Sequence, residues 1–190
     1  PKMNLSIRNE TARLRAVLLG TAVSSGPVPK IEDCYDPKSI EHIRNGTYPR
    51  EEDMVSEMEG FAGILKKHDV EVFRPKVIEN VNQIFARDIG FVIEDILVRS
   101  NILPAREEEL DAVAHIYNQM DPAKRISPPE EVHVEGGDVM PWNDHIFVGM
   151  YSGSDYADYI TARTNVHAVS FIKELFPNKI VRSFELRKSI

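Results

Sequence analysis

The sequence predicts an α/β fold made of repeated units, and three observations support this prediction. Short apolar runs of strand length alternate with segments in which apolar residues recur every three to four positions, as they do on one face of a helix. A helix followed by a strand is expected three times along the chain. Two strand-turn-strand segments also resemble each other at an offset of 50 positions, 138 minus 88. Units this small cannot bury their own apolar faces, so we expect several to pack together.

The composition fits one globular domain over residues 1–190. Of the 190 residues, 42% are hydrophobic and 28% are charged, close to the averages of globular proteins. The net charge of -7 gives no broad basic surface, which argues against nucleic acid or a membrane surface as a partner. No run approaches the ~20 apolar residues that cross a bilayer. An acidic protein can still bind a small cationic substrate.

The single cysteine and the first residues indicate where the protein resides. Cys34 has no second cysteine to pair with, which favours a reducing compartment, and we expect a cytoplasmic location. The start of the chain lacks the apolar stretch of a secretory signal. It begins at Pro1 and not at a methionine, from which we expect trimmed ends. These observations leave a homodimer open.

The first unit is expected over residues 1–75. A continuous apolar run at 16–20 predicts a buried strand, and the Pro- and Gly-rich segment 24–49 predicts a loop or a short irregular helix. A short strand follows at 70–73, closed by Arg74-Pro75 because proline removes a hydrogen-bond donor. Between them, one helix face is predicted from Met54, Val55, Met58, Phe61, Ala62 and Leu65.

Two further units are expected over 76–134 and 135–190, each with a hairpin, a helix and a strand. In the second unit, a hairpin at 89–98 turns at Glu94-Asp95, a helix is marked by Leu110, Val113, Ala114 and Tyr117, and a strand is expected at Val132-His133-Val134. In the third unit, the hairpin covers 139–148, the helix is marked by Val166, Val169, Ile172, Leu175 and Phe176, and the strand covers 179–184.

The repeat offset aligns these hairpins residue by residue. Asp88 corresponds to Asp138, Ile96 to Ile146, and Val98 to Val148. In this repeat, the strand that ends each unit comes directly before the hairpin of the next unit. The strand at 179–184 should therefore come before a further hairpin, which would begin beyond Ile190. We therefore expect the chain to be the N-terminal part of a longer architecture, with about three modules.

Two carboxylate motifs stand at equivalent places, each directly before a hairpin: Phe85-Ala86-Arg87-Asp88 and Glu135-Gly136-Gly137-Asp138. Equivalent ends of repeated units tend to converge, and adjacent glycines permit close backbone approach. Carboxylates gathered in one place repel each other unless a cation compensates them, and a planar guanidinium suits them because they accept its N–H groups in a bidentate manner. The alternative reading is a structural Arg-Asp ion pair and an ordinary Gly-Gly turn.

Four segments of the chain resemble arginine deiminases and amidinotransferases, which belong to the pentein superfamily. The resemblance lies in Asn9-Glu10 with residues 13–20, in the two carboxylate motifs, and in Ala162-Arg163-Thr164-Asn165. These segments occur in the same order over nearly the whole chain. The resemblance implies a five-fold pseudo-symmetric α/β propeller whose centre binds a guanidine or amidine group.

The resemblance also implies roles for individual residues. The expected catalytic residues are Asp88 and Glu135, which would hold guanidinium nitrogens, and Asp138, which would support the site. Arg163 matches a family arginine that binds a substrate carboxylate. The same matched motifs contribute the remaining expected substrate-binding residues, Phe85, Arg87 and Asn165.

Family members complete the reaction with a histidine, usually in a His-x-Asp segment, and with a cysteine near the C-terminus. The thiolate attacks the guanidinium carbon to form a covalent intermediate, and the histidine acts as acid and base. Here His145 and His167 lack the matching aspartate, and Cys34 lies in the early loop. We therefore expect this chain alone to be inactive, and the complete form to be an amidinotransferase or an arginine deiminase-like hydrolase acting on arginine or a related guanidino compound.

Other charged residues are given structural interpretations. His133 is expected to be a strand histidine, and the run Arg106 to Glu109 a solvated helix start. The histidines show no zinc spacing, and the second motif lacks a dinucleotide fingerprint, so we expect neither a metal nor a cofactor.

Two alternative functions stay open. Pentein architecture also occurs in ribosome anti-association factors, which bind without catalysis and need no guanidine-gripping carboxylates. A half-enzyme completed by another chain that supplies the histidine and cysteine is the other alternative.

Overall fold

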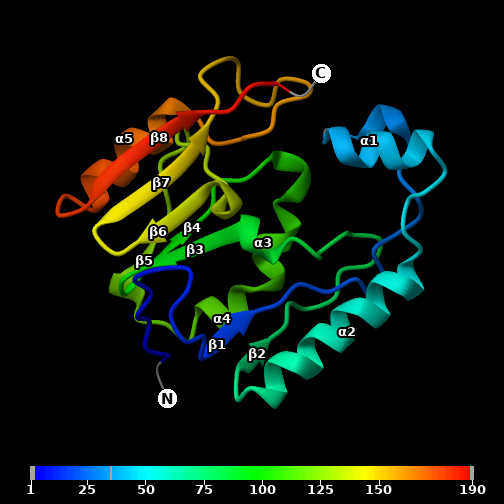
Figure 1. Ribbon diagram of the computed structural model, residues 1–190, viewed down its shortest axis with the longest axis horizontal. Coiled ribbons are helices and arrows are strands. Elements are labelled where there is room, and N and C mark those ends of the chain that lie inside the picture. Colours follow the sequence, from blue (N-terminus) through cyan, green and yellow to red (C-terminus); the bar gives the residue numbers. More distant parts are fainter. Residues whose placement is uncertain (1–2, 35, 189–190) are drawn as a thin grey trace.

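The computed structural model describes residues 3–34 and 36–188, and these residues form an α/β fold with three separate sheets. Figure 1 shows the sheets side by side, with helices packed against them. The described residues form no closed barrel. Among them, no helix is long and apolar enough to cross a membrane.

The first sheet pairs two parallel strands that a long helix connects. Strand β1 (Ala16–Leu18) pairs with β2 (Glu71–Phe73), and helix α2 (Glu51–Lys67) lies between them in sequence. Both predicted strands and the predicted helix are confirmed. The preceding loop contains a 3-10 turn at Ile31–Asp33 and a regular eight-residue helix, α1 (Pro37–Arg44).

The second sheet contains the predicted hairpin and one strand that the sequence did not indicate. Strand β3 (Gly90–Ile93) pairs antiparallel with β4 (Ile96–Arg99), which pairs in parallel with the two-residue strand β5 (Arg125–Ile126). The predicted helix is divided into two short helices, α3 (Glu108–Ala112) and α4 (Ala114–Tyr117). Three-residue 3-10 turns occupy Pro104–Arg106 and Pro122–Lys124.

The strand predicted at Val132-His133-Val134 is wrong. These residues carry no strand assignment, and the parallel partner of β4 is β5 instead. Val132 and Val134 are nevertheless buried in the core, and the Val134 amide donates to the Asn101 carbonyl at 3.2 Å. Their apolar alternation therefore reflects burial of an extended segment and not membership of a sheet.

The third sheet agrees with the prediction in order and type. Strand β6 (Val139–Trp142) pairs antiparallel with β7 (His145–Met150), which pairs in parallel with β8 (Ile180–Glu185). Helix α5 (Val166–Leu175) connects β7 and β8.

The hairpins of the second and third sheets correspond at an offset of 49 and not 50. Their two-residue turns start at Glu94 and Asn143, both with positive φ, so Leu97 corresponds to Ile146 and Val98 to Phe147. The expected pairs Ile96 with Ile146 and Val98 with Val148 are therefore wrong. The offset of 50 holds just before the hairpins, where the 3-10 turns Ala86–Ile89 and Gly136–Asp138 contain the two aspartates.

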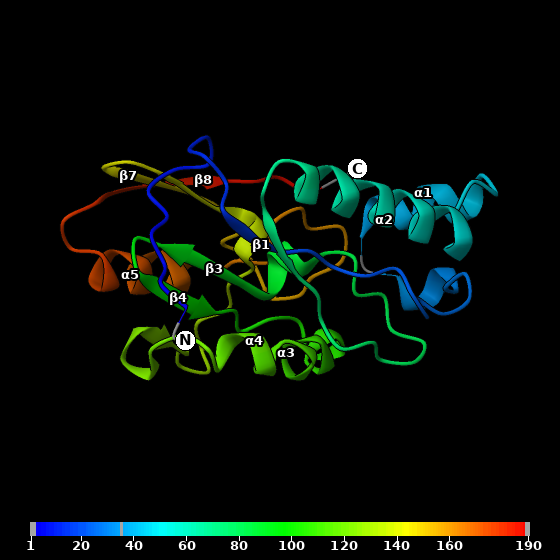
Figure 2. The ribbon, with the colours of Figure 1, turned by 90° about the horizontal axis from the view of Figure 1, so that it is seen from below.

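The helices of the second and third units, α3 with α4 and α5, are each packed between two sheets. The core formed around α5 contains Ile146 and Val148 from its own sheet and also Phe91 and Val98 from the second sheet. The core around α3 and α4 likewise joins the second sheet to side chains of β1 and β2. Figure 2 shows α5 below β7 and β8, and α3 and α4 below the β3–β4 hairpin.

The N-terminal segment connects the second and third units. Ile7 exchanges two backbone hydrogen bonds with Glu94, at 2.9 and 2.6 Å, and the Asn143 amide donates to the Arg8 carbonyl at 2.7 Å. Near the first described residue, the Met3 amide donates to the Gln119 carbonyl at 2.9 Å. This segment therefore crosses both hairpin turns.

Candidate functional site

The two carboxylate motifs come into direct contact. Arg87 Nε donates to the Gly136 carbonyl at 3.1 Å, and its Nη2 donates to the Val139 carbonyl at 2.9 Å. A Cβ atom added to Gly137 would lie 2.4 Å from Asp88 Oδ1. The first motif therefore lies against the backbone of the second.

The two glycines of the second motif make this approach possible. A Cβ atom at Gly136 would lie 2.2 Å from the Arg87 carbonyl oxygen and 2.7 Å from that of Gly90. Real Cβ atoms do not approach this closely, so any side chain would push the two motifs apart.

Asp88 binds an arginine of its own chain. Arg106 Nη1 donates to Asp88 Oδ2 at 2.8 Å, and Nη2 donates to the Phe85 carbonyl at 3.2 Å. The same guanidinium donates to both carboxylate oxygens of Glu109, at 2.6 and 3.0 Å. Arg106 and Glu109 are only 7% and 3% exposed. The run does start a helix, and Glu107 and Glu108 are exposed. The expectation that it is solvated is wrong for Arg106 and Glu109.

Glu135 binds a second arginine in a bidentate manner. Arg163 Nε and Nη2 donate to its two carboxylate oxygens at 2.7 and 2.8 Å, and Glu135 is 4% exposed. The Glu135 amide donates to Thr164 Oγ1 at 3.1 Å, and this hydroxyl donates to Asp138 Oδ2 at 2.6 Å. Thr164 therefore connects the first and last residues of the second motif.

Burial and neighbouring charge shift the protonation of this cluster. Burial, reinforced by the Glu135 charge, raises the pKa of Asp138 to about 6. Burial also raises the pKa of Glu109, although the Arg106 hydrogen bond opposes it, and the charges of Asp88 and Glu135 raise it further. Burial disfavours the charged form of Arg106 and so lowers its pKa. The hydrogen bonds and negative charges of Glu109 and Asp88 have the larger effect, and the pKa of Arg106 is raised. The cluster thus favours guanidinium groups and disfavours additional negative charge.

Of the remaining expected substrate-binding residues, Arg87 and Asn165 have structural contacts. The Phe85 side chain is 59% exposed. Besides its backbone contacts, Arg87 donates from Nη1 and Nη2 to the Glu10 carboxylate at 3.1 and 2.7 Å. Asn165 caps helix α5 by accepting from the Ala168 amide at 3.0 Å, and its Nδ2 donates to the Glu131 carbonyl at 2.9 Å. Asn165 is therefore placed to start a helix.

His133 lies beside the second motif in an irregular segment. Its ring stacks on Tyr156, with centroids 4.7 Å apart. Its Nδ1 lies 2.9 Å from Asp155 Oδ2, but the geometry does not make a hydrogen bond. The short distance alone does not make a hydrogen bond, because a hydrogen bond also requires alignment. Burial, with the charges of Asp155 and Glu135, raises the pKa of Tyr156 to about 12.

Cys34 lies in a different part of the molecule from the carboxylates. It precedes α1, which lies far from β6, β7 and β8 in Figure 1. Burial, together with Asp36 and Asp33, raises the pKa of its thiol. These neighbours disfavour the thiolate, which is the nucleophilic form.

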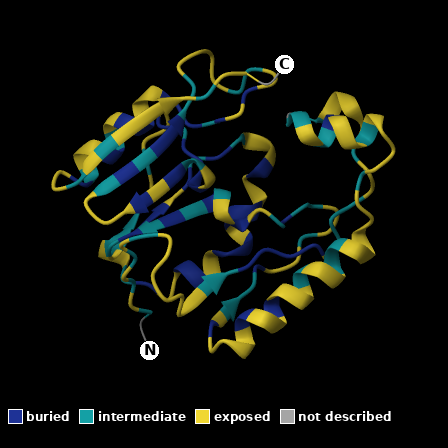
Figure 3. Cartoon of the chain, viewed as in Figure 1, coloured by how far each residue is buried: buried dark blue, intermediate teal, exposed yellow. Residues whose placement is uncertain are grey.

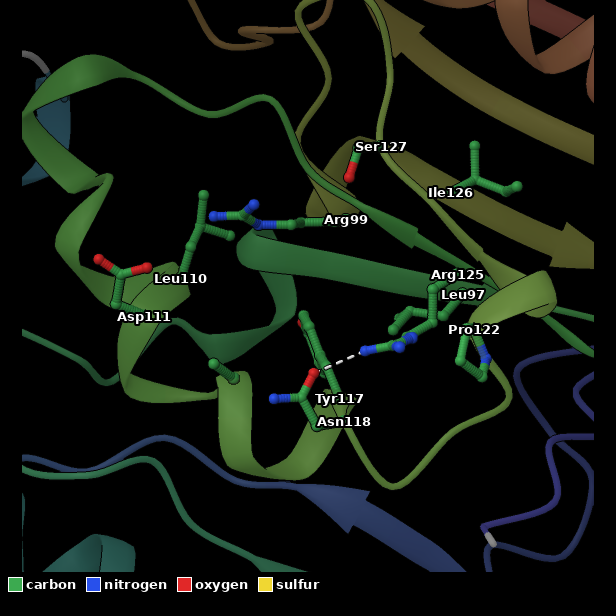
Figure 4. A pocket seen from close by; sticks show the side chains of 11 residues that line it. Leu97, Arg99, Leu110, Asp111, Tyr117, Asn118, Pro122, Arg125, Ile126 and Ser127 are labelled. Carbon is green, nitrogen blue, oxygen red and sulfur yellow. Dashed lines mark hydrogen bonds between the residues drawn. The ribbon is translucent and has the colours of Figure 1, made fainter.

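Two cavities, of about 350 and 460 Å³, are lined by none of the residues of the two motifs. One cavity of about 350 Å³ lies between β4, β5 and the helices α3 and α4, with Arg99, Asp111 and Arg125 among its lining. Figure 4 shows this cavity, where Arg125 bonds to Asn118. Within residues 3–34 and 36–188, no cluster of three or more His, Cys, Asp or Glu side chains could hold a metal.

Sequence reasoning missed three residues of the cluster: Arg106, Glu109 and Thr164. The i, i+3 spacing of Arg106 and Glu109 allows them to pair on a helix, but it does not indicate that the pair is buried. Thr164 lies inside a segment that the family resemblance had already marked.

Comparisons with known proteins give structural matches but no sequence matches. No family model matches the sequence, and no curated protein matches it. An amidinotransferase of the saxitoxin pathway from Microseira wollei matches with a TM-score of 0.68 and 15% identity, over 95% of this chain and 62% of that one. Inosamine-phosphate amidinotransferase from Streptomyces griseus matches with a TM-score of 0.69 and 16% identity, over 96% of this chain and 63% of that one. DDAH from Pseudomonas aeruginosa, complexed with citrulline, matches with a TM-score of 0.66 and 13% identity, over 93% of this chain and 63% of that one.

The structural neighbours are amidinotransferases, DDAH and an arginine dihydrolase, all of the pentein superfamily. The resemblance stated from the motifs is thus confirmed for the fold, although at 13–16% identity the likeness extends to the fold alone. The chain spans 62–63% of the length of these three structures.

Proposed function

We propose that this pentein-fold chain forms the substrate-binding part of an enzyme that modifies the guanidine group of arginine or of a related compound. In the complete enzyme a cysteine forms the covalent intermediate, and the enzyme acts as an amidinotransferase or as a hydrolase of linear amidines. The three sheets belong to a five-fold propeller with modules at 1–75, 76–134 and 135–190. This chain supplies binding carboxylates and lacks the catalytic histidine and cysteine.

One observation carries the proposal: the carboxylates of the two touching motifs each bind a guanidinium group. The Arg106 guanidinium donates a hydrogen bond to Asp88, and the Arg163 guanidinium donates two parallel hydrogen bonds to Glu135. Fork-to-fork pairing of this kind is specific for planar guanidinium groups. The cluster therefore has the chemistry that a guanidino substrate requires.

A substrate guanidinium would share or replace these internal partners. Asp88 is 18% exposed at its side chain, against 5% for Glu135, so Asp88 is the more accessible acceptor. Glu135 would become available when Arg163 turns towards a substrate carboxylate. Asp138, held by Thr164, would support the second motif.

Binding of L-arginine to the 190-residue chain tests the gripping role. Isothermal titration calorimetry should detect binding, and Asp88→Asn should weaken it about tenfold or more because a charged acceptor is lost. The control Asp144→Asn changes an exposed carboxylate outside both motifs and should bind like the unchanged chain. Equal affinity of all three proteins would contradict the role of Asp88.

A second candidate, a half-enzyme completed by another chain, is favoured by the surroundings of Cys34. Its raised pKa makes it a poor nucleophile. Affinity purification from the source cells should then recover a partner chain. The mixture should release citrulline, ornithine or ammonia from arginine, whereas the purified chain should not.

A further inference from the structure

Two cavities of the second unit join into one hollow. The cavity of about 350 Å³ between β4, β5, α3 and α4 shares Arg99, Leu110, Asp111 and Ser127 with a second cavity of about 460 Å³. All the residues that line the two cavities lie within residues 97–130. The helices of this unit pack against the first sheet, and α5 packs against its sheet. The hollow therefore belongs to the unit that has a described neighbour on each side.

The charged side chains of the hollow are separated by sign. The cavity of about 350 Å³, which we call the basic cavity, is lined by Arg99 and Arg125 with one carboxylate, Asp111. The cavity of about 460 Å³, which we call the acidic cavity, is lined by Asp111, Glu107 and Glu130 with one guanidinium, that of Arg99. Arg99 and Asp111 line both cavities and so mark the junction between them. A ligand that spans the junction meets positive charge at one end and negative charge at the other.

None of these five charged side chains forms an ion pair within residues 3–34 and 36–188. Arg125 donates to the neutral side chain of Asn118 at 2.6 Å, which Figure 4 shows as a dashed line. The neighbouring Lys124, by contrast, pairs with Asp95 at 2.8 Å. Charges of both signs thus line one hollow without pairing, and they complement a ligand that itself carries both signs.

Ser100 lines the acidic cavity and has a hydroxyl without a partner. It is only 2% exposed, and its Oγ forms no hydrogen bond within the part of the chain that the structure describes. A buried hydroxyl without a hydrogen bond is unfavourable, because it has lost its contact with water. A charged group of a ligand in the acidic cavity supplies the bond that the protein does not.

The floor of the hollow is apolar. Leu97 and Tyr117 line the basic cavity, Ile102 lines the acidic cavity, and Leu110 lines both. All four are buried, whereas Asp111 beside Leu110 is exposed; Figure 3 shows both buried and exposed residues on α3. In Figure 4 the Arg99 side chain extends from β4 towards α3. An apolar floor with a charged rim suits a ligand whose charged ends are joined by methylene groups.

We propose that this hollow binds a basic α-amino acid of the lysine type. The α-carboxylate binds Arg99 and Arg125, the α-ammonium binds Asp111, and the side-chain ammonium lies in the acidic cavity with Glu107 and Glu130. The lining carries two positive and three negative charges, so a ligand with one net positive charge balances it. No residue of the two carboxylate motifs lines the hollow, and the proposal does not depend on the guanidine chemistry.

Isothermal titration calorimetry of the 190-residue chain with L-lysine, which has no guanidine group, tests the site. Arg99→Gln and Glu107→Gln should each weaken binding about tenfold or more, because each removes a charged partner. The matched controls Arg44→Gln and Glu57→Gln change exposed, unpaired residues outside the hollow and should bind like the unchanged chain. Absence of lysine binding, or equal affinity in variants and controls, overturns the proposal. Circular dichroism checks that each variant is folded.

Two analogues of lysine test the orientation of the ligand. L-norleucine lacks the side-chain ammonium, so Glu107→Gln should not weaken its binding, whereas Arg99→Gln should. Cadaverine lacks the carboxylate, so the two variants should have the reverse effects. If Glu107→Gln weakens the binding of norleucine and of lysine by the same factor, the assigned orientation is wrong and the proposal fails.

Backbone amide resonances locate the bound ligand. L-lysine should shift the amides of Leu97, Ser100 and Ser127 and leave those of Gly136 and Gly137 unchanged. Shifts confined to Gly136 and Gly137 place the lysine at the carboxylate motifs and overturn the proposal. The same spectra recorded with L-arginine report separately on the motifs, so a failure of the proposed function is distinguished from a failure of this site.

Discussion

At the scale of single residues, Arg106 is the group on which the cluster most depends. It donates to Asp88 and Glu109 while only 7% exposed. Removing one partner of a buried ion pair leaves a charge without compensation in a poorly solvated site. The arginine is therefore both a contact of the first motif and a structural requirement.

Arg106→Met should lower the free energy of unfolding by about 3–5 kcal/mol, because Glu109 then stays buried without a cation. Arg50→Met is the matched control, since Arg50 forms an exposed pair with Asp53; it should change the free energy of unfolding far less, because solvent screens an exposed ion pair. Urea denaturation at neutral pH measures both. An equal loss of unfolding free energy in the two variants would show that the burial of the Arg106 ion pair adds nothing to its contribution to stability.

Asp138 should make stability depend on pH. Its folded pKa of about 6 is higher than the ordinary value of 3.8, so the folded state binds more protons than the unfolded state between these values. Stability from this group therefore falls as pH rises from about 4 to about 6, by about 1–2 kcal/mol after allowance for partial exposure. Asp138→Asn, which still accepts from Thr164, should remove that fall. The free energy of unfolding of both proteins, measured at about pH 4.5 and about pH 7 near the two ends of this range, gives the difference.

The sequence allowed the motif carboxylates to be predicted but not their partners. Asp88, Glu135 and Asp138 stand in tetrapeptides at equivalent places before two hairpins, and such patterns are local. The pairing of Asp88 with Arg106 joins residues 18 positions apart, and that of Glu135 with Arg163 joins residues 28 apart. These contacts depend on how the sheets pack, which no local pattern contains.

At the scale of elements, glycines of two kinds should respond in opposite ways. In α2, a Cβ at Gly63 meets nothing within 4 Å, so Gly63→Ala should raise the free energy of unfolding by about 0.5–1 kcal/mol through helix propensity. At Gly136 the nearest backbone oxygen is 2.2 Å away, so Gly136→Ala should cost about 2 kcal/mol or more through overpacking. Thermal unfolding of dilute protein compares them. A stabilised Gly136→Ala variant would mean that the two motifs can separate freely.

Helices α2 and α5 and the longer strands could be predicted because their apolar residues recur at regular spacing. Strand β5 could not, since it has only two residues and one of them is Arg125. At Val132 and Val134 the error is the opposite one, because a strand is predicted there and none forms. Their side chains are buried as in a strand, but periodicity reports which side chains are buried and not which backbone groups are paired.

At the scale of the whole molecule, the N-terminal segment holds the second and third units together. Among the described residues 3–9, deleting residues 1–9 removes four backbone hydrogen bonds: one from the Met3 amide, two that Ile7 exchanges with Glu94, and one to the Arg8 carbonyl. The expected loss is about 4 kcal/mol, at about 1 kcal/mol for each bond. Chemical denaturation measures it, and hydrogen exchange should accelerate at the amides of Glu94 and Asn143. Unchanged exchange there would mean that the segment contributes no restraint.

The same segment has a consequence for the order of events during biosynthesis. Asn9 is translated before its side-chain partner Asn143, which lies 134 positions later. The segment that contains Asn9 therefore stays without this partner until the third unit has been translated. Contacts of such long range slow folding, because a large loop must close before any gain is realised. We expect this segment to dock only after the two hairpins that it crosses have formed.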